Sequence, residues 1–147
     1  MLFTRLNSQL AALMVKYSHD KELHTTLRKL IKDYVDAQQP ERGTIGEGAK
    51  IVNTVEITNS ILGYYCEVNV AFRLSDVTIM GTADVSVFIG TGVICENSVI
   101  GDGASLLNHA IVQDCLIGEE CKISNGFTAA ESVIFANSNL SKGEATN

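Results

Sequence analysis

From Ile45 onward, apolar and polar residues follow one repeated order. An aliphatic residue is followed by glycine, two mostly polar residues, a small residue, one polar residue and a second aliphatic residue. Four copies occupy residues 45–51, 62–68, 100–106 and 117–123, and their first residues lie 17 apart within each pair. A fixed short period is typical of a solenoid, in which each repeat packs on its neighbour. The pattern predicts a stacked β fold.

One turn divides into six, six and five residues, which predicts three short strands around a triangle. Stacked turns about 4.8 Å apart form parallel sheets whose side chains alternate inward and outward. In two coils the predicted inward residues are Ile100, Ala104, Leu106, Ala110, Val112 and Cys115, followed by Ile117, Cys121, Ile123, Phe127, Ala129 and Ser132. The coil from Ile45 has the corresponding set Ile45, Ala49, Ile51, Val55, Ile57 and Ser60. By this count about five coils run from residue 45 to 133, and a partial sixth follows.

The corners of the triangle need unusual backbone angles. We expect the glycine after each aliphatic residue to supply them. Asn53, Asn108 and Asn125 fall at one equivalent corner, where asparagine tolerates the left-handed region. Between residues 80 and 99 the register loosens by about three residues, which predicts a bulge or short loop near residues 84–88.

Residues 4–38 follow a helical period instead. Apolar residues recur at Leu6, Leu10, Leu13, Met14 and Tyr17, and again at Leu23, Leu27, Leu30, Ile31 and Tyr34. The helical spacing of apolar residues is interrupted between these two sets, where Ser18 or Asp20 would be a good N-cap for the second helix. This predicts two amphipathic helices of about 14 and 18 residues, ended by Pro40. The chain divides into a helical cap, 1–43, which we expect to cover the first coil, and a repeat domain, 44–147.

Charge and composition exclude several classes of partner. The net charge is −6, and no dense run of Lys or Arg is present, so binding to nucleic acid or to an anionic membrane is not expected. No apolar stretch approaches the roughly 20 residues of a bilayer span, and the start lacks a signal-peptide pattern. We therefore expect a cytoplasmic protein.

The four cysteines are Cys66, Cys95, Cys115 and Cys121. They form no CxxC pair, and no histidine stands at metal-ligand spacing from them. Their expected role is as small buried hydrophobic residues, with a disulfide or a metal site as the alternative. No metal or other cofactor is expected. Ser60, Ser98 and Ser132 recur before the aliphatic pair of their coils, and we expect an inward ladder of small residues rather than a nucleophile set.

The [LIV]-Gly-x-x-x-x hexads resemble the hexapeptide-repeat superfamily. That resemblance implies a left-handed parallel β-helix, whereas general crossover rules favour right-handed connections. The predicted fold is mainly β, a left-handed parallel β-helix of about five to six coils with two N-terminal amphipathic helices. Segments 42–49, 59–63, 130–137 and 143–145 further resemble an internal part of long uncharacterised bacterial hexapeptide-repeat proteins. This second resemblance implies that the chain is a fragment or a short relative of such a protein.

The resemblance also implies a homotrimer, which the outward aliphatic residues Val52 and Leu107 favour. Superfamily transferases use acyl-CoA or acyl carrier protein and place a histidine base between subunits. His109, the one histidine in the repeats, is predicted at an outward corner, with Asn108 and Asn125 as the nearest orienting groups. Residues 113–118 resemble the His-Asp-Cys stretch of UDP-N-acetylglucosamine acyltransferases. Gln113 stands where those enzymes have the catalytic histidine, and glutamine accepts no proton at neutral pH.

Two functions follow from these observations. In the first, the chain is a non-catalytic β-helix, a structural or assembly part of a larger protein. In the second, it is an acyltransferase-like enzyme with His109 as base, which binds an acyl donor and a nucleotide-sugar or other small acceptor at subunit interfaces. If His109 has no function, it is a solvated surface residue.

Overall fold

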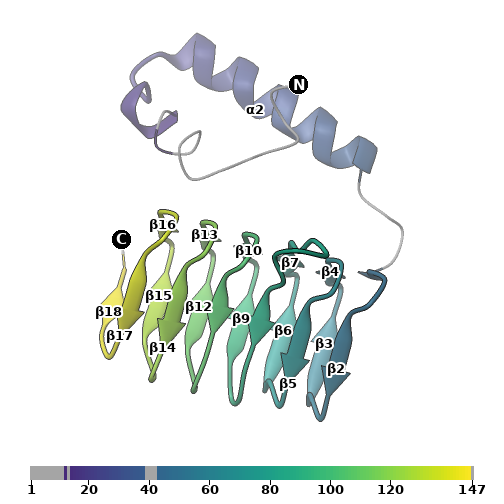
Figure 1. Ribbon diagram of the computed structural model, residues 1–147. Helices are drawn as coiled ribbons and strands as arrows, with labels where there is room; N and C mark the ends of the chain where they lie inside the picture. Colours follow the sequence, from purple (N-terminus) through teal and green to yellow (C-terminus); the bar gives the residue numbers. More distant parts are fainter. Residues whose placement is uncertain (1–11, 13, 39–42, 147) are drawn as a thin grey trace.

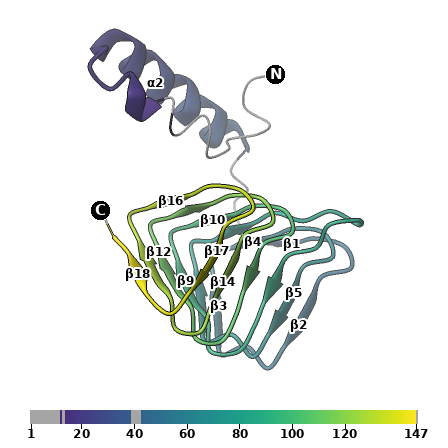
Figure 2. The same cartoon turned by 60° about the vertical axis from the view of Figure 1, so that its left-hand side comes forward.

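The computed structural model describes residues 12, 14–38 and 43–146 and shows a mainly β parallel solenoid of about six turns (Figure 1). Each turn contributes one short strand to each of three six-stranded parallel sheets, and the view in Figure 2 shows the triangular cross-section. Sheet A contains β1 (Thr44–Ile45), β4 (Ile61–Leu62), β7 (Thr78–Ile79), β10 (Val99–Ile100), β13 (Leu116–Ile117) and β16 (Val133–Ile134). Sheet B contains β2 (Lys50–Val52), β5 (Glu67–Asn69), β8 (Phe88–Ile89), β11 (Ser105–Leu106), β14 (Lys122–Ser124) and β17 (Asn139–Ser141). Sheet C contains β3 (Glu56–Thr58), β6 (Arg73–Ser75), β9 (Ile94–Glu96), β12 (Ile111–Gln113), β15 (Thr128–Ala130) and β18 (Glu144–Ala145).

The 17-residue period is also the pairing register of the strands. Ile100 pairs with Ile117, and Leu106 pairs with Ile123. The exception lies between β7 and β8, where Val68 pairs with Ile89 and the spacing is 21 residues. The loop predicted near residues 84–88 is confirmed, and it holds four additional residues rather than three.

The interior follows the predicted phase. In the coil from Ile100 every predicted inward residue is buried, with at most 5% of its surface exposed. Cys121 and Ile123 are 1% and 0% exposed, which confirms their inward assignment.

The first coil differs from this pattern. The inward assignment of Val55 is wrong, because Val55 is 73% exposed and its equivalent in the next coil, Phe72, is 51% exposed beside the buried Ala71. Ile45 and Ile51 do hold inward positions, in register with the buried Leu62 and Val68, but they are 64% and 39% exposed. This end of the core is open to solvent.

Helix α2 (Lys21–Gln38) follows the second predicted helix closely. A carboxylate oxygen of Asp20 accepts a hydrogen bond from the backbone N–H of Leu23 at 3.0 Å, so Asp20 rather than Ser18 is the N-cap. The first predicted helix lies mostly outside the described residues, of which residues 12 and 14–16 are helical. The exposure of Ile45 and Ile51 shows that the described residues of the helical segment do not cover the first coil.

The glycines that follow the aliphatic residues have a different role from the one predicted. Left-handed backbone angles occur instead at Gly48, Gly92, Gly103 and Gly126, with φ between 70° and 73°. A Cβ atom on Gly63 would lie 2.7 Å from the carbonyl carbon of Met80. A Cβ atom on Gly101 would lie 2.9 Å from the amide nitrogen of Glu119. Because real Cβ atoms do not approach a backbone this closely, glycine is needed here for the tight stacking of coils, not for corner angles.

The asparagine corner is confirmed. Asn53, Asn108 and Asn125 have φ of 48°, 50° and 57°, in the left-handed region that asparagine tolerates. Val70 occupies the same corner one coil after Asn53 and has φ of 57°. A β-branched residue is strained in this region, so Val70 holds a conformation that its own side chain disfavours.

Replacing Val70 with asparagine is expected to stabilise the protein by about 1 kcal/mol, because asparagine enters the left-handed region at lower cost. Urea unfolding followed by circular dichroism measures the change. Val85→Asn is the matched control, since Val85 and Val70 are 37% and 41% exposed but only Val70 has a positive φ. A Val70→Asn protein no more stable than the wild type would contradict the proposed strain at Val70.

Candidate functional site

His109 lies at the corner between β11 and β12 and is exposed to solvent. Its φ is 62°, whereas glycine fills the matching place in the coils on either side, at Gly92 and Gly126. The ring leans over Gly92, where a Cβ atom would collide with the imidazole. The backbone N–H of His109 donates to the carbonyl oxygen of Thr91 at 2.9 Å. The corner therefore holds the histidine outward, as the sequence predicts.

The two amides expected to orient the imidazole are bonded along the solenoid instead. Nδ2 of Asn108 donates to Oδ1 of Asn125 at 3.1 Å, and Nδ2 of Asn125 donates to Oγ of Ser141 at 2.9 Å. Among the described residues no hydrogen bond joins either amide to His109. The corner thus forms an amide ladder from coil to coil, and a role of His109 as general base stays a prediction.

Gln113 belongs to a second ladder, on the outer face of sheet C. Its Nε2 donates to one carboxylate oxygen of Glu96 at 2.9 Å, and Nη1 of Arg73 donates to the other at 3.0 Å. Arg73 also contacts Glu56, with Nε 3.2 Å from the carboxylate. The hydrogen bond from Gln113 is the largest cause of a lowered pKa of Glu96, and the hydrogen bond from Arg73 is the second. In this chain Gln113 therefore holds a carboxylate across adjacent coils.

The serines that recur before the aliphatic pairs stabilise the corner between sheets C and A. Oγ of Ser98 donates to the carbonyl oxygen of Glu96 at 2.7 Å and accepts from the amide of Cys115 at 3.0 Å. Ser60 bonds Thr58 in the same way, at 2.8 Å. These hydroxyls form the small-residue ladder that was predicted.

All four cysteines are buried free thiols, as predicted for small hydrophobic residues. Burial raises the pKa of each thiol, and that of Cys95 reaches about 12. A thiol with so high a pKa carries little thiolate at neutral pH and is a poor nucleophile.

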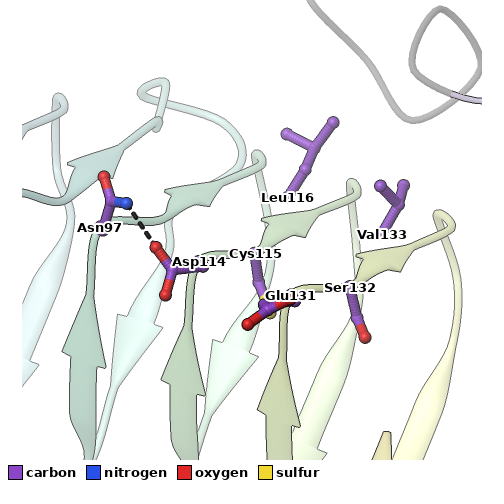
Figure 3. Close-up of a pocket in the computed structure, with 7 residues that line it drawn as sticks. All are labelled: Asn97, Asp114, Cys115, Leu116, Glu131, Ser132 and Val133. Atoms are coloured by element: carbon purple, nitrogen blue, oxygen red, sulfur yellow. Dashed lines mark hydrogen bonds between the residues drawn. The ribbon is translucent and has the colours of Figure 1, made fainter. Parts of the chain in front are cut away.

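A shallow groove of about 280 Å³ runs along the corner between sheets C and A (Figure 3). The amide of Asn97 donates to the carboxylate of Asp114, Glu131 follows on the next coil, and Leu116 and Val133 project at the edge. Asn59 and Asp76 form the same pair at an earlier coil. The hexad pattern does not single out this corner, although Asn and Asp 17 residues apart mark it. The groove combines negative charge with apolar surface.

Two kinds of site are not found in the part of the chain that is described. Its His, Cys, Asp and Glu side chains form no group of three or more that is placed to hold a metal ion. Its helices also do not combine the length and the hydropathy that crossing a bilayer requires.

Residues 1–147 match the model of the family described as "Domain of unknown function (DUF4954)". The match covers the whole sequence. The chain belongs to this family. Comparison with curated proteins and with solved structures gave no match.

Proposed function

We propose that this DUF4954 chain is a non-catalytic structural and assembly module, built as a left-handed β-helix of the hexapeptide-repeat type. The supporting observation is how its polar side chains are used. Gln113 bonds Glu96 and Asn108 bonds Asn125, each across adjacent coils. Such ladders tie one coil to the next and stiffen the stack. The groups that an enzyme would need to orient a base are engaged in this stacking.

Association into a homotrimer is the second part of the proposal. Its support is the outer face of sheet B, where Val52 is 44% exposed and Leu107 and Phe88 are half-buried. Outward aliphatic side chains do not contribute to the interior of the solenoid, and contact with a second copy would remove them from water. The rigid, flat side of a solenoid suits such a contact.

The catalytic alternative is tested by assaying the purified chain for transfer from acetyl-CoA to a UDP-sugar. We expect no transfer, and the same null result for His109→Ala. Loss of a general base typically lowers a rate by about 10²- to 10⁴-fold. Transfer that the wild-type chain performs and His109→Ala abolishes would overturn the structural proposal and establish His109 as the base.

Sedimentation equilibrium tests the assembly. The expected mass is three times the 15.8 kDa of one chain. The double variant Val52→Glu, Leu107→Glu is expected to sediment as a monomer, whereas Thr128→Glu on sheet C is expected to remain trimeric. A wild-type monomer across micromolar concentrations would refute the trimer. A crystal structure fixes the handedness of the coil, and a right-handed coil would refute the hexapeptide-repeat type.

A further inference from the structure

The outer face of sheet A carries an apolar stripe that runs along the solenoid. Residues in pairing register across five strands form it, and we call them the sheet A stripe: Ile61, Thr78, Val99, Leu116 and Val133. Two residues after each member of the stripe, a second outward position runs along the same face. Gly101 and Gly118 occupy it in two adjacent coils and leave a flat strip between Met80 and Phe135, which are 36% and 49% exposed. A flat surface with few long side chains allows close approach of another element.

Carboxylates border the sheet A stripe on both sides. Asp114 and Glu131 line the groove on the side toward sheet C, and Asp102, Glu119 and Glu120 lie at the corner toward sheet B. The excess of acidic over basic side chains extends over the whole solenoid, since residues 43–147 hold 12 acidic and 4 basic side chains. Residues 1–42 hold 5 acidic and 7 basic ones. The two parts of the chain therefore carry opposite net charge.

Helix α2 has the complementary surface. Its apolar residues share one stripe, namely Leu23, Leu27, Leu30 and Ile31. Leu23 and Leu30 are 40% and 45% exposed, so this stripe is not packed against the solenoid in the structure. Arg28 and Lys32 follow one flank of it, one helical turn apart. Long basic side chains beside an apolar stripe suit an apolar surface with an acidic border.

The helix is also long enough to cover the stripe. An 18-residue helix is about 27 Å long, and the five strands of the sheet A stripe, spaced about 4.8 Å apart, span about 19 Å. Figures 1 and 2 both show α2 on the sheet A side, with its C-terminal end toward the first coil. The five residue steps from Gln38 to Gly43 reach at most about 18 Å. The helix is thus tethered beside the face that it matches.

We propose that α2 docks lengthwise on the sheet A stripe of its own chain. Leu27 and Leu30 contact the stripe and the flat strip, and Arg28 and Lys32 face the bordering carboxylates. The docked helix shields the apolar face from other molecules. This proposal does not depend on the oligomeric state of the chain.

Hydrogen exchange of the full chain tests the docking, because an isolated 18-residue helix of this composition is marginal in water and exchanges fast. We expect α2 amides of the wild type to exchange on the order of 10-fold more slowly than those of Leu116→Asp. Leu116→Asp changes the face without touching the helix. Ile111→Asp, on the outer face of sheet C, is the matched control and is expected to leave α2 protected. Protection of the solenoid amides in the same experiment shows that each variant is folded.

Charge reversal and dilution complete the test. Arg28→Glu with Lys32→Glu is expected to remove the protection, and adding Asp114→Lys with Glu131→Lys is expected to restore part of it. Equal exchange of α2 in the wild type and in Leu116→Asp would overturn the proposal. Protection that disappears on dilution would also overturn it, because the helix would then dock on a second copy.

Discussion

Leu106→Ala is expected to destabilise the protein by about 2–5 kcal/mol, the usual cost of removing a fully buried leucine side chain. Leu106 is 0% exposed and lies between Ile89 and Ile123 in sheet B. Since its neighbours belong to stacked coils with paired backbones, they cannot collapse far into the space. Urea unfolding followed by circular dichroism at a single protein concentration gives the change in free energy.

The control for this substitution is Ile111→Ala. Ile111 points outward on sheet C and is only half-buried, so the expected loss is about 1 kcal/mol or less. Equal losses for the two variants would mean that inward and outward positions were assigned in the wrong phase. Strand side chains alternate with a period of two, so such an error would move every interior residue to the surface.

The interior was predictable from the sequence because its determinants repeat. Ile100, Ala104 and Leu106 recur 17 residues later as Ile117, Cys121 and Ile123, and both sets are buried. A stack of similar coils forces equivalent residues into equivalent environments. The outward corner of His109 was predictable for the same reason.

Features that depend on contact between coils were harder to predict. Glycine after an aliphatic residue suggests corner angles, and only the backbone of the next coil shows that close approach is the reason. The sheet C ladder was missed although two of its contacts, Arg73 with Glu56 and Gln113 with Glu96, keep the 17-residue spacing. Its third contact, Arg73 with Glu96, spans 23 residues, because the four-residue insertion between β7 and β8 places Arg73 in register with Ile94 and Glu96 lies two residues further on. The groove beside Asp114 was missed because its acidic and apolar parts come from different positions of the repeat.

Gly63→Ala is expected to destabilise the protein by about 1–3 kcal/mol, the usual cost of forcing an additional methyl group into a packed region. The new Cβ atom would lie 2.7 Å from the carbonyl carbon of Met80 and 2.8 Å from the amide nitrogen of Gly81. These are backbone atoms of the next coil and cannot rotate away, so two coils must separate and weaken their pairing. Thermal or urea unfolding measures the loss.

Gly126→Ala separates this steric effect from backbone strain. Gly126 has φ of 71°, and a Cβ atom added there would meet no other atom within 4 Å, so alanine costs only the left-handed conformation, about 1–2 kcal/mol. Asparagine tolerates that conformation, and Gly126→Asn is expected to recover most of the loss. At Gly63 the larger asparagine side chain is expected to be worse than alanine. If asparagine instead rescued Gly63→Ala, corner angles rather than coil spacing would explain the glycine after each aliphatic residue.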